Sequence, residues 1–270
     1  MESQYINLLC KCIQSKTRTT RNATVYSTFG ERLEHDFKDG FPLLTTKKVF
    51  FKGIVEELAW FLRGSTDVGE LKAKGVHIWD KNTSDREDDA GPVYGFQWRH
   101  FGARYQDNKT KYGGVDQIKT VIDLIKKDPT SRRIFMSAWN PSQQDKMCLP
   151  PCHVSYQFYV NDGRVSCQMY QRSADVFLGL PFNIASTALL LQLIAHECDL
   201  TPGKMIICIG DAHLYHSHLK VALKQIVRQP VAFPFIQIKR EKDELKNVEL
   251  SQIALLNYNP HSVLKASMIT

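Results

Sequence analysis

Cys152 is the residue in this sequence whose type and neighbours point most directly to chemistry. It follows Pro150 and Pro151 and precedes His153, so an imidazole lies beside a thiol on a restrained backbone. Proline holds φ at about −65° and restricts the residue before it. A thiolate is a strong nucleophile, so this arrangement favours covalent catalysis. The alternative is packing, because free cysteine is among the most buried residue types.

The residues after this thiol predict the elements that hold it in place. Apolar side chains alternate over residues 154–160 and again over 165–169, which is typical of two strands. Residues 161–163 between them, Asn-Asp-Gly, tolerate φ > 0, so we expect a β-hairpin. The apolar run 184–198 has the length and period of a helix.

Polar side chains gather where the second strand of the hairpin ends. Gln171, Arg172, Ser173 and Asp175 follow closely, and Asn183 precedes the expected helix. Functional residues are often carried by loops on a rigid scaffold, so these side chains and the thiol form a candidate site. Two alternatives stay open. Arg172 could form a surface ion pair, and Asn183 could cap the helix.

Taken together, these residues closely resemble the active-site region of the thymidylate synthase family. The resemblance covers nearly the whole chain in ordered blocks, which is far more specific than one motif. Besides PPCH, QFYV and CQMYQRSADVFLGLPFNIA, the blocks are Arg21, FPLLTTKK (41–48), EELAWFLRG (56–64), IWD (78–80), GPVYGFQWRHFGA (91–103), DPTSRRIFMSAWNP (128–141), GDAHLYHSHL (210–219) and YNPHSVLK (258–265).

The resemblance implies a reaction, the reductive methylation of dUMP to dTMP. The co-substrate would be 5,10-methylenetetrahydrofolate, released as dihydrofolate, and Cys152 would form a covalent adduct at carbon 6 of uracil. The folate supplies both carbon and hydride, so we expect neither a metal nor a nicotinamide.

It also implies roles for individual residues. For catalysis, Cys152 would be the nucleophile, with Glu57, Tyr94, His153 and Asp175 in support. Phosphate would be held by arginines and a serine, the uracil edge by an amide, and the 3′-hydroxyl by His213 and Tyr215; the full substrate-binding set is Arg21, Arg132, Arg133, Arg172, Ser173, Gln171, Asn183, His213 and Tyr215. The folate would contact Lys47, Ile78, Trp79, Asp175, Leu178, Gly179, Phe182 and Thr270. In that set Trp79 would stack on the folate, and Lys47 would meet its glutamate tail.

Three of these residues have ordinary alternatives. Residues 51–62 predict a buried helix in which Glu57 has apolar neighbours, and burial would raise the pKa of its carboxyl group. Glu57 could instead face outward with Glu56. Arg132 and Arg133 precede an expected strand at 134–139 and could simply be solvated. The resemblance favours a proton-transfer role for Glu57, and it implies that both arginines reach the phosphate in a partner subunit's site.

The chain departs from the family at two places. The family usually has Arg-Thr-Gly-Thr-Gly-Thr where this chain has Arg21 to Tyr26 without glycine. Members commonly end in a small apolar residue such as valine, whose carboxylate helps close the site over the folate. Here the last residue is Thr270, with which we still expect closure.

The fold class that we expect is α/β in the α+β sense, as one domain spanning 1–270. A mixed twisted sheet would carry helices on one side, and the resemblance implies that its other face packs on a second subunit in a homodimer. Further elements are a helix with Ile6, Leu9, Cys10 and Ile13 on its apolar face, a helix at 115–127, and a short strand at 205–210.

Composition excludes several classes of protein. At 270 residues and 43% hydrophobic content the chain can bury a full core. We expect no membrane span, since no run approaches the about 18 to 20 apolar residues required.

Seven cysteines without the spacing of a disulfide framework indicate reduced thiols. We therefore expect a cytoplasmic protein, and a nuclear presence is compatible with this. His213, His216 and His218 suggest a metal, but their spacing does not complete a site.

Two other functions remain in view. A pyrimidine nucleotide hydroxymethylase would use the same cysteine but let water finish the reaction. Its cytosine form requires an acceptor for the amino group, so Asn183 argues against it, although not against a uracil form. The net charge of +7 would also suit an RNA-binding protein, but aromatic residues do not interleave with the lysines. Binding to nucleic acid is therefore not required.

Overall fold

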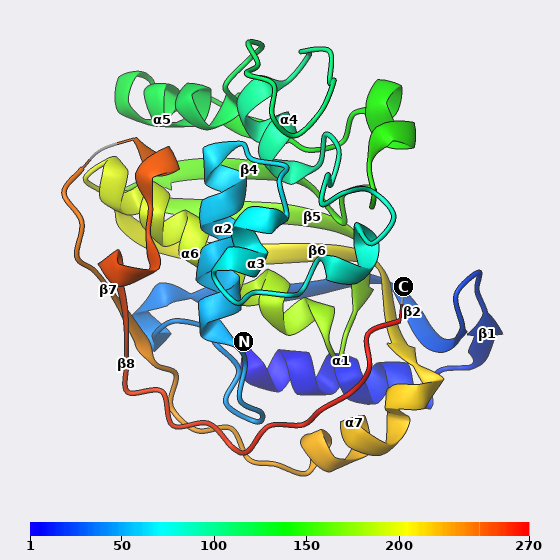
Figure 1. Ribbon diagram of the computed structural model, residues 1–270. Helices are drawn as coiled ribbons and strands as arrows, with labels where there is room; N and C mark the ends of the chain where they lie inside the picture. The colour runs from blue at the N-terminus through cyan, green and yellow to red at the C-terminus, as the bar shows by residue number, and fades with distance from the viewer. Residues whose placement is uncertain (243, 270) are drawn as a thin grey trace.

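The computed structural model describes residues 1–242 and 244–269 and is built around a six-stranded mixed sheet (Figure 1). The strands lie in the order β1-β2-β6-β5-β4-β3, in which only β5 and β6 run parallel. Their bounds are β1 Thr17–Thr19, β2 Thr24–Asp36, β3 Phe135–Ser137, β4 His153–Asn161, β5 Arg164–Asp175 and β6 Thr201–Tyr215. A separate antiparallel pair is formed by β7 (Phe235–Ile238) and β8 (Ile253–Leu256).

Helices cover one face of the six-stranded sheet. The α-helices are α1 Glu2–Gln14, α2 Phe51–Arg63, α3 Gly69–Ala73, α4 Tyr94–His100, α5 Gln117–Lys127, α6 Gly179–Glu197 and α7 Leu219–Ile226. Helix α6 packs on β5 and β6, α1 packs on β2 and β6, and α2 packs on α6, in front of the sheet in Figure 1. Short 3-10 helices are Phe37–Asp39, Asp80–Asn82, Pro141–Lys146, His216–His218, Leu245–Asn247 and Leu250–Gln252.

The opposite face of the sheet carries exposed aromatic side chains. Phe135 pairs with Gln157, two residues from Tyr159, and Tyr170 pairs with Ser155, so the three aromatic residues share a face. Tyr159 is 66% exposed. Their neighbours of opposite parity, such as Phe158 and Met169, are buried beneath the helices. The expected fold class, a mixed sheet with helices on one side, is therefore confirmed, and the aromatic face is accessible in this single chain.

The hairpin predicted around residues 161–163 is present as β4 and β5. Asp162 and Gly163 have φ of 48° and 70°, as the Asn-Asp-Gly sequence indicated. Strand β5 continues further than the apolar alternation suggested. Its last residues, Gln171 to Asp175, are paired with β4 and β6 and do not form a loop.

Other element bounds correct the sequence-based expectations. Strand β6 extends to Tyr215, well beyond the expected 205–210, because β2 and β5 pair with it on both edges. Helix α6 begins at Gly179, since Asp175 Oδ1 accepts hydrogen bonds from the backbone N–H groups of Phe177 and Leu178 at its start. Asn183 therefore lies inside the helix, and the expected cap was wrong.

Two helices also differ in detail. The buried face of α1 is made by Tyr5, Leu8, Leu9 and Cys12, which follow the i, i+3, i+4, i+7 spacing, so of the face expected only Leu9 is buried. Helix α5 begins after Asp116, whose side chain accepts from the N–H of Lys119. The strand expected at 134–139 is shorter in the structure, where β3 spans Phe135–Ser137.

Helix α6 corrects the statement that no run of the chain is long and apolar enough to cross a bilayer. By length and mean hydropathy it is apolar enough to cross a bilayer, but 72% of the relevant window is buried inside the protein. A helix that is apolar all round is typical of the centre of a large core. Here it packs between the sheet and α2.

A buried carboxylate ties the N-terminal helix to the loop that precedes α2. Glu2 accepts hydrogen bonds from Thr45 N (2.8 Å), Thr45 Oγ1 (2.7 Å) and Thr46 N (2.7 Å). From the other side, Gln225 Nε2 donates to Thr46 Oγ1 at 3.0 Å and Arg228 Nη1 donates to Thr46 O at 2.8 Å. Residues 45–46 thus join α1 and α7.

This network predicts a large stability effect for a residue distant from Cys152 in sequence. Glu2→Ala would leave buried N–H groups without acceptors, so we expect a loss of about 3 kcal/mol in the free energy of unfolding. Urea denaturation is the measurement. Exposed Glu241 offers the control, because Glu241→Ala should change stability by less than about 0.5 kcal/mol. Equal effects of the two substitutions would contradict the role given to Glu2.

Candidate active site

The thiol of Cys152 lies directly before β4, held by groups from two other elements. Its backbone N–H donates to the hydroxyl of Tyr94 at 2.7 Å, and Tyr94 is buried at the start of α4. The guanidinium Nη2 of Arg172 lies 3.8 Å from Sγ. Burial raises the pKa of Cys152 and Arg172 opposes that shift only in part, so the thiol of the free protein is mostly protonated. Arg172 therefore favours the thiolate, but by less than burial disfavours it.

Arg172 is itself fixed by the two prolines before the thiol. Nε donates to Pro151 O at 2.9 Å and Nη2 donates to Pro150 O at 2.7 Å, while the guanidinium lies 5.7 Å from the ring centroid of Trp139. The backbone N–H of Arg172 also donates to Cys152 O at 3.0 Å. The alternative of a surface ion pair was wrong. Sequence analysis overlooked a role for Trp139, whose only signal was its place at the end of the expected strand.

An amide pair lies beside this cluster. Gln171 Nε2 donates to Asn183 Oδ1 at 2.7 Å and to Ser173 O at 3.0 Å, which connects β5 to α6. The Gln171 donor therefore identifies the oxygen of the Asn183 amide, whose NH₂ group is a donor.

His153 lies at the start of β4 with a buried ring. Its Nδ1 lies 3.1 Å from the hydroxyl of Tyr156, a partner that sequence analysis overlooked. Burial lowers the pKa of His153 to about 4, against a smaller opposing effect of Asn183. The imidazole is therefore neutral at physiological pH and can act as a hydrogen-bonding group, not as a standing charge.

Glu57 in α2 points toward Trp79, so the alternative that it faces outward with Glu56 was wrong. Trp79 Nε1 donates to Glu57 Oε1 at 2.7 Å. Burial raises the pKa of Glu57 from its usual 4.5 to about 7, against the effect of that hydrogen bond. Glu56 is the residue paired elsewhere, with Lys74 at 2.6 Å. Glu57 can therefore take up or release a proton near neutral pH.

The residues expected at the folate lie around the start of α6 and beside α2. Asp175 accepts from the turn at 177–178, Gly179 begins the helix, and Phe182 lies in its first turns. Trp79 is only 5% exposed and packs on Trp60 and Phe61. Ile78 precedes it in the chain.

Lys47, expected at the glutamate tail of the folate, lies in the loop before α2. Its side chain is buried, and Nζ donates to the carbonyl oxygen of Phe177. The ammonium group thus points into the protein in this structure.

The far end of β6 carries the residues expected at the sugar. His213 Nδ1 lies 3.2 Å from Asp211 Oδ1, and the rings of His213 and Tyr215 are 5.2 Å apart. Asp211, which sequence analysis overlooked, also forms an ion pair with Arg18. His216 stacks on Tyr26, while His218 bonds Ser267 O at 2.8 Å. The three histidines therefore diverge, and within 1–242 and 244–269 no three potential metal ligands gather.

Three of the expected phosphate ligands stand apart from this cluster. Arg21, Arg132 and Arg133 are exposed, and in the part of the chain that the structure describes their side chains make no hydrogen bond to the residues around Cys152. Arg21 follows β1 in the tight turn of the β1–β2 hairpin, where Thr20 N donates to Ala23 O. Thr270 lies outside the described residues. The segment just before it is held by Lys81 Nζ, 3.2 Å from Met268 O.

Comparison with known proteins identifies this arrangement. A model of the thymidylate synthase family matches residues 3–270. The chain belongs to the thymidylate synthase family. It is 50% identical to thymidylate synthase of Herpesvirus ateles over 99% of this chain and 97% of that protein, and 46% identical to that of equine herpesvirus 2 over 99% and 98%.

Some relatives of this thymidylate synthase family member are longer. A bifunctional dihydrofolate reductase-thymidylate synthase of Zea mays is 48% identical over 99% of this chain but 54% of its own length. The chain thus spans about half the length of the bifunctional relatives. The expected family, fold class and enzyme class, a methyltransferase of this family, are confirmed.

The position of Glu57 predicts a pH-dependent stability. Because its pKa is raised on folding, the protonated carboxyl stabilises the fold fully below pH 4.5, and that contribution is lost as pH rises through about 7. Glu57→Gln, which stays neutral, should therefore gain stability relative to wild type across this interval, on the order of 2 kcal/mol after discounting for partial exposure. Urea unfolding from pH 4.5 to 8 measures it, with exposed Glu87→Gln as a control whose difference stays flat. If the stability difference between Glu57→Gln and wild type did not change with pH, the pKa of Glu57 would not be raised on folding.

Proposed function

We propose that the protein is a thymidylate synthase that converts dUMP to dTMP with 5,10-methylenetetrahydrofolate and releases dihydrofolate. One observation carries the proposal. The backbone N–H of Cys152 is held by the hydroxyl of Tyr94, and the Sγ atom of Cys152 lies 3.8 Å from Nη2 of Arg172. Helix α6 presents the amide of Asn183 beside them, bonded to Gln171. Family membership supports the assignment.

The thiol supplies what the pyrimidine lacks. Carbon 5 of uracil is too weakly nucleophilic to take a one-carbon unit unaided. When Cys152 Sγ adds to carbon 6, the electron pair of the 5,6 double bond moves toward carbon 5 and O4, so carbon 5 becomes the nucleophile. The co-substrate supplies the carbon unit and the hydride. Carbon 5 attacks the methylene carbon of the co-substrate, and loss of the carbon-5 proton then expels tetrahydrofolate and leaves an exocyclic methylene group. Hydride transfer from tetrahydrofolate, which becomes dihydrofolate, reduces this group to the methyl, while Cys152 Sγ is expelled and the 5,6 double bond is restored.

Charge at this step is controlled by Arg172. Because burial disfavours the thiolate, the free thiol stays protonated and unreactive toward other electrophiles. The guanidinium 3.8 Å away stabilises negative charge on sulfur when it develops. With Arg21 and Ser173, and with Arg132 and Arg133 from a partner, it would also hold the substrate phosphate.

The amide pair supports the choice of uracil. Asn183 Oδ1 accepts from Gln171 Nε2 at 2.7 Å, and an amide oxygen can accept a further hydrogen bond, here from the N3–H of uracil. Its NH₂ group then faces O4. Cytosine would present an amino group to that donor, leaving two donors opposed.

Glu57 and His153 suit the proton transfers. A carboxyl group with a pKa of about 7 can accept and return a proton at neutral pH, and the neutral imidazole of His153 can orient water without adding charge. Trp79 holds Glu57 in place at 2.7 Å. In this scheme Tyr94 positions the backbone at Cys152, while His213 and Tyr215 bind the sugar.

The hydroxymethylase alternative receives no support from the comparisons, because the relatives reported are named thymidylate synthase, alone or in a bifunctional protein.

We also propose a homodimer. The exposed aromatic face with Phe135, Tyr159 and Tyr170 suits burial against its own copy, and Arg132 and Arg133 precede β3 on the edge of the same sheet. A cytoplasmic location remains our expectation.

The proposed reaction makes a direct prediction. Purified protein with dUMP and methylenetetrahydrofolate should form dihydrofolate, followed by absorbance, and dTMP, identified chromatographically. Cys152→Ala should lower turnover by at least about 10⁴-fold while the fold persists, because no other group can form the adduct. Fluoro-dUMP with the folate should give a covalent complex with wild type only. Hydroxymethyl-dUMP as main product would support the alternative, and an active Cys152→Ala enzyme would refute the mechanism.

Shared sites make a second prediction. A subunit with Arg133→Ala, weak by itself, should regain activity when mixed with Cys152→Ala subunits, because one site of each mixed dimer then holds both groups. We expect up to about a quarter of wild-type activity per subunit at random exchange, since half the dimers are mixed and each has one complete site. Mixing two tagged Cys152→Ala samples is the control. Verified exchange without recovery would mean that each site is built from one chain.

A further inference from the structure

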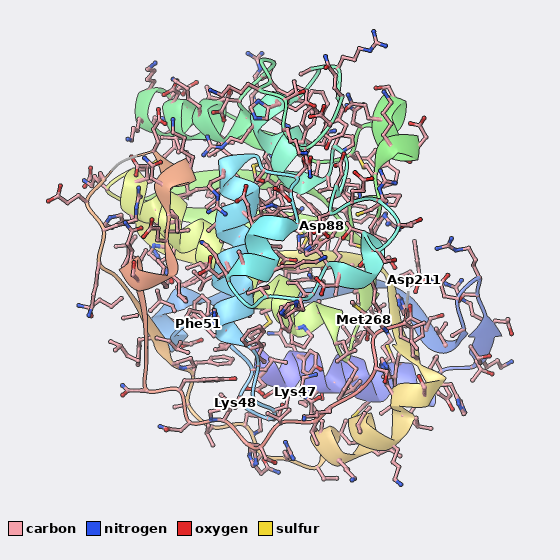
Figure 2. All side chains as sticks on the ribbon, viewed as in Figure 1. Lys47, Lys48, Phe51, Asp88, Asp211 and Met268 are labelled. Atoms are coloured by element: carbon pink, nitrogen blue, oxygen red, sulfur yellow. The ribbon has the colours of Figure 1, made fainter. Side chains whose placement is uncertain are left out.

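The carboxylate of Asp211 lies beside the residues proposed to bind the sugar, and the mechanism above gives it no task. Figure 2 labels Asp211 on β6, at the side of the molecule that also carries the β1–β2 hairpin. Its Oδ1 lies 3.2 Å from Nδ1 of His213, and its Oδ2 accepts from Nη2 of Arg18. Both carboxylate oxygens are therefore engaged, one by a residue of β6 and one by a residue of β1.

The contact between Asp211 and His213 has a defined direction. A carboxylate has no hydrogen to donate, so Nδ1 of His213 is the donor. A neutral imidazole carries one N–H group, which leaves Nε2 with a lone pair that can accept. The hydroxyl group of a sugar can donate to such a nitrogen. Asp211 therefore selects the tautomer of His213 that accepts a hydrogen bond from the 3′-hydroxyl.

Tyr215 restrains the same imidazole in a different way. The rings of His213 and Tyr215 lie 5.2 Å apart with 85° between their planes, and the side chain of His213 is 14% exposed. An edge-to-face contact of this kind holds the plane of the ring. It does not distinguish the two nitrogen atoms, which the hydrogen bond to Asp211 does. The two neighbours thus have separate effects on one side chain.

Arg18 balances a charge that would otherwise oppose an anionic ligand. In the parallel pair of β5 and β6, Asp211 lies opposite Ser173, one of the residues proposed to bind the phosphate. Charges of like sign repel, so an unpaired carboxylate here would weaken phosphate binding. The guanidinium of Arg18 reaches this carboxylate across β2, where Phe29 is the register partner of Asp211. The side chain of Arg18 is 55% exposed, so we assign the ion pair to charge balance and not to stability.

We propose that Asp211 is a positioning residue for the nucleotide. It presents Nε2 of His213 as the acceptor for the 3′-hydroxyl, while Arg18 neutralises the carboxylate beside the phosphate. The inference rests on the proposed function for the identity of the nucleotide, dUMP. It divides the affinity for dUMP, because the part that depends on Asp211 is the part that the 3′-hydroxyl supplies.

The experiment compares two nucleotides that differ in one hydroxyl group. The substrate dUMP carries the 3′-hydroxyl, and 2′,3′-dideoxyuridine monophosphate lacks it. Calorimetric titration of wild type should give a Kd about tenfold lower for dUMP, the value of one hydrogen bond. In Asp211→Ala this preference should fall to within about twofold. The loss of a charge affects both nucleotides equally, so the ratio of the two Kd values isolates the hydroxyl group.

The role of Arg18 has its own variant. Arg18→Met leaves the contact between Asp211 and His213 intact, so the preference for dUMP should persist. Both Kd values should rise by the same factor, about threefold, because the carboxylate beside the phosphate is no longer balanced. Asp85→Ala, at an exposed aspartate between α3 and α4, is the matched control and should change neither Kd.

Several outcomes would overturn the inference. A wild type without preference for dUMP, or a preference that persists in Asp211→Ala, would refute the role of Asp211. Unchanged Kd values in Arg18→Met would refute charge balance. A wild type that binds dUMP without forming dTMP would refute the proposed function alone, because the ratio of Kd values still tests the positioning role. A wild type that binds neither nucleotide would refute both.

A conservative variant and a kinetic measurement guard against a merely structural effect. Asp211→Asn keeps one oxygen that can accept from Nδ1 of His213, so it should retain at least about a threefold preference for dUMP. At saturating dUMP the kcat of Asp211→Ala should stay within about threefold of wild type while KM rises, because the hydroxyl lies apart from the reacting carbons. Thermal unfolding shows whether each variant is folded. A folded Asp211→Asn protein without preference would also count against the proposed contact.

Discussion

The parallel pairing of β5 with β6 is the constraint on which the site depends. It places Ser173 beside Asp211 and Asp175 beside His213, and the crossover between the two strands is α6, which carries Asn183 over the ends of both. The antiparallel neighbour β4 then brings Cys152 next to Arg172. The groups proposed to bind the nucleotide, its pyrimidine and the co-substrate thus meet because a parallel pair requires a long connection, here a helix that packs back on the sheet.

Burial gives this site its chemical character. It raises the pKa of Cys152 and of Glu57, and it lowers that of His153 and of Lys47, so all four are shifted toward their neutral forms. Desolvation penalises whichever form carries charge, which explains the common direction. Arginine guanidinium groups supply the positive charge that an anionic nucleotide requires. The lower dielectric constant that accompanies burial also strengthens each remaining electrostatic interaction.

Much of this could be predicted from local sequence. The alternation of apolar and polar residues predicted both strands of the hairpin, and the Asn-Asp-Gly sequence predicted its turn. The apolar residues of 51–62 predicted α2. The motifs around Cys152 indicated the family that the comparisons confirmed. Two of the errors share a cause. The end of β6 and the buried face of α1 are set by which neighbours pair or pack, and those neighbours lie far away in the chain. The start of α6 is set locally instead, by the carboxylate of Asp175.

By itself, then, the sequence determined the residue types, the spacing of the thiol, the family and the main elements, because these follow from covalent order and hydrophobic period. Only the tertiary structure decided the direction of individual side chains. Glu57 faces Trp79 while adjacent Glu56 faces Lys74, and Lys47 turns inward while adjacent Lys48 stays exposed. Neighbouring residues of one type have nearly equal local preferences, so their orientation depends on partners from distant segments.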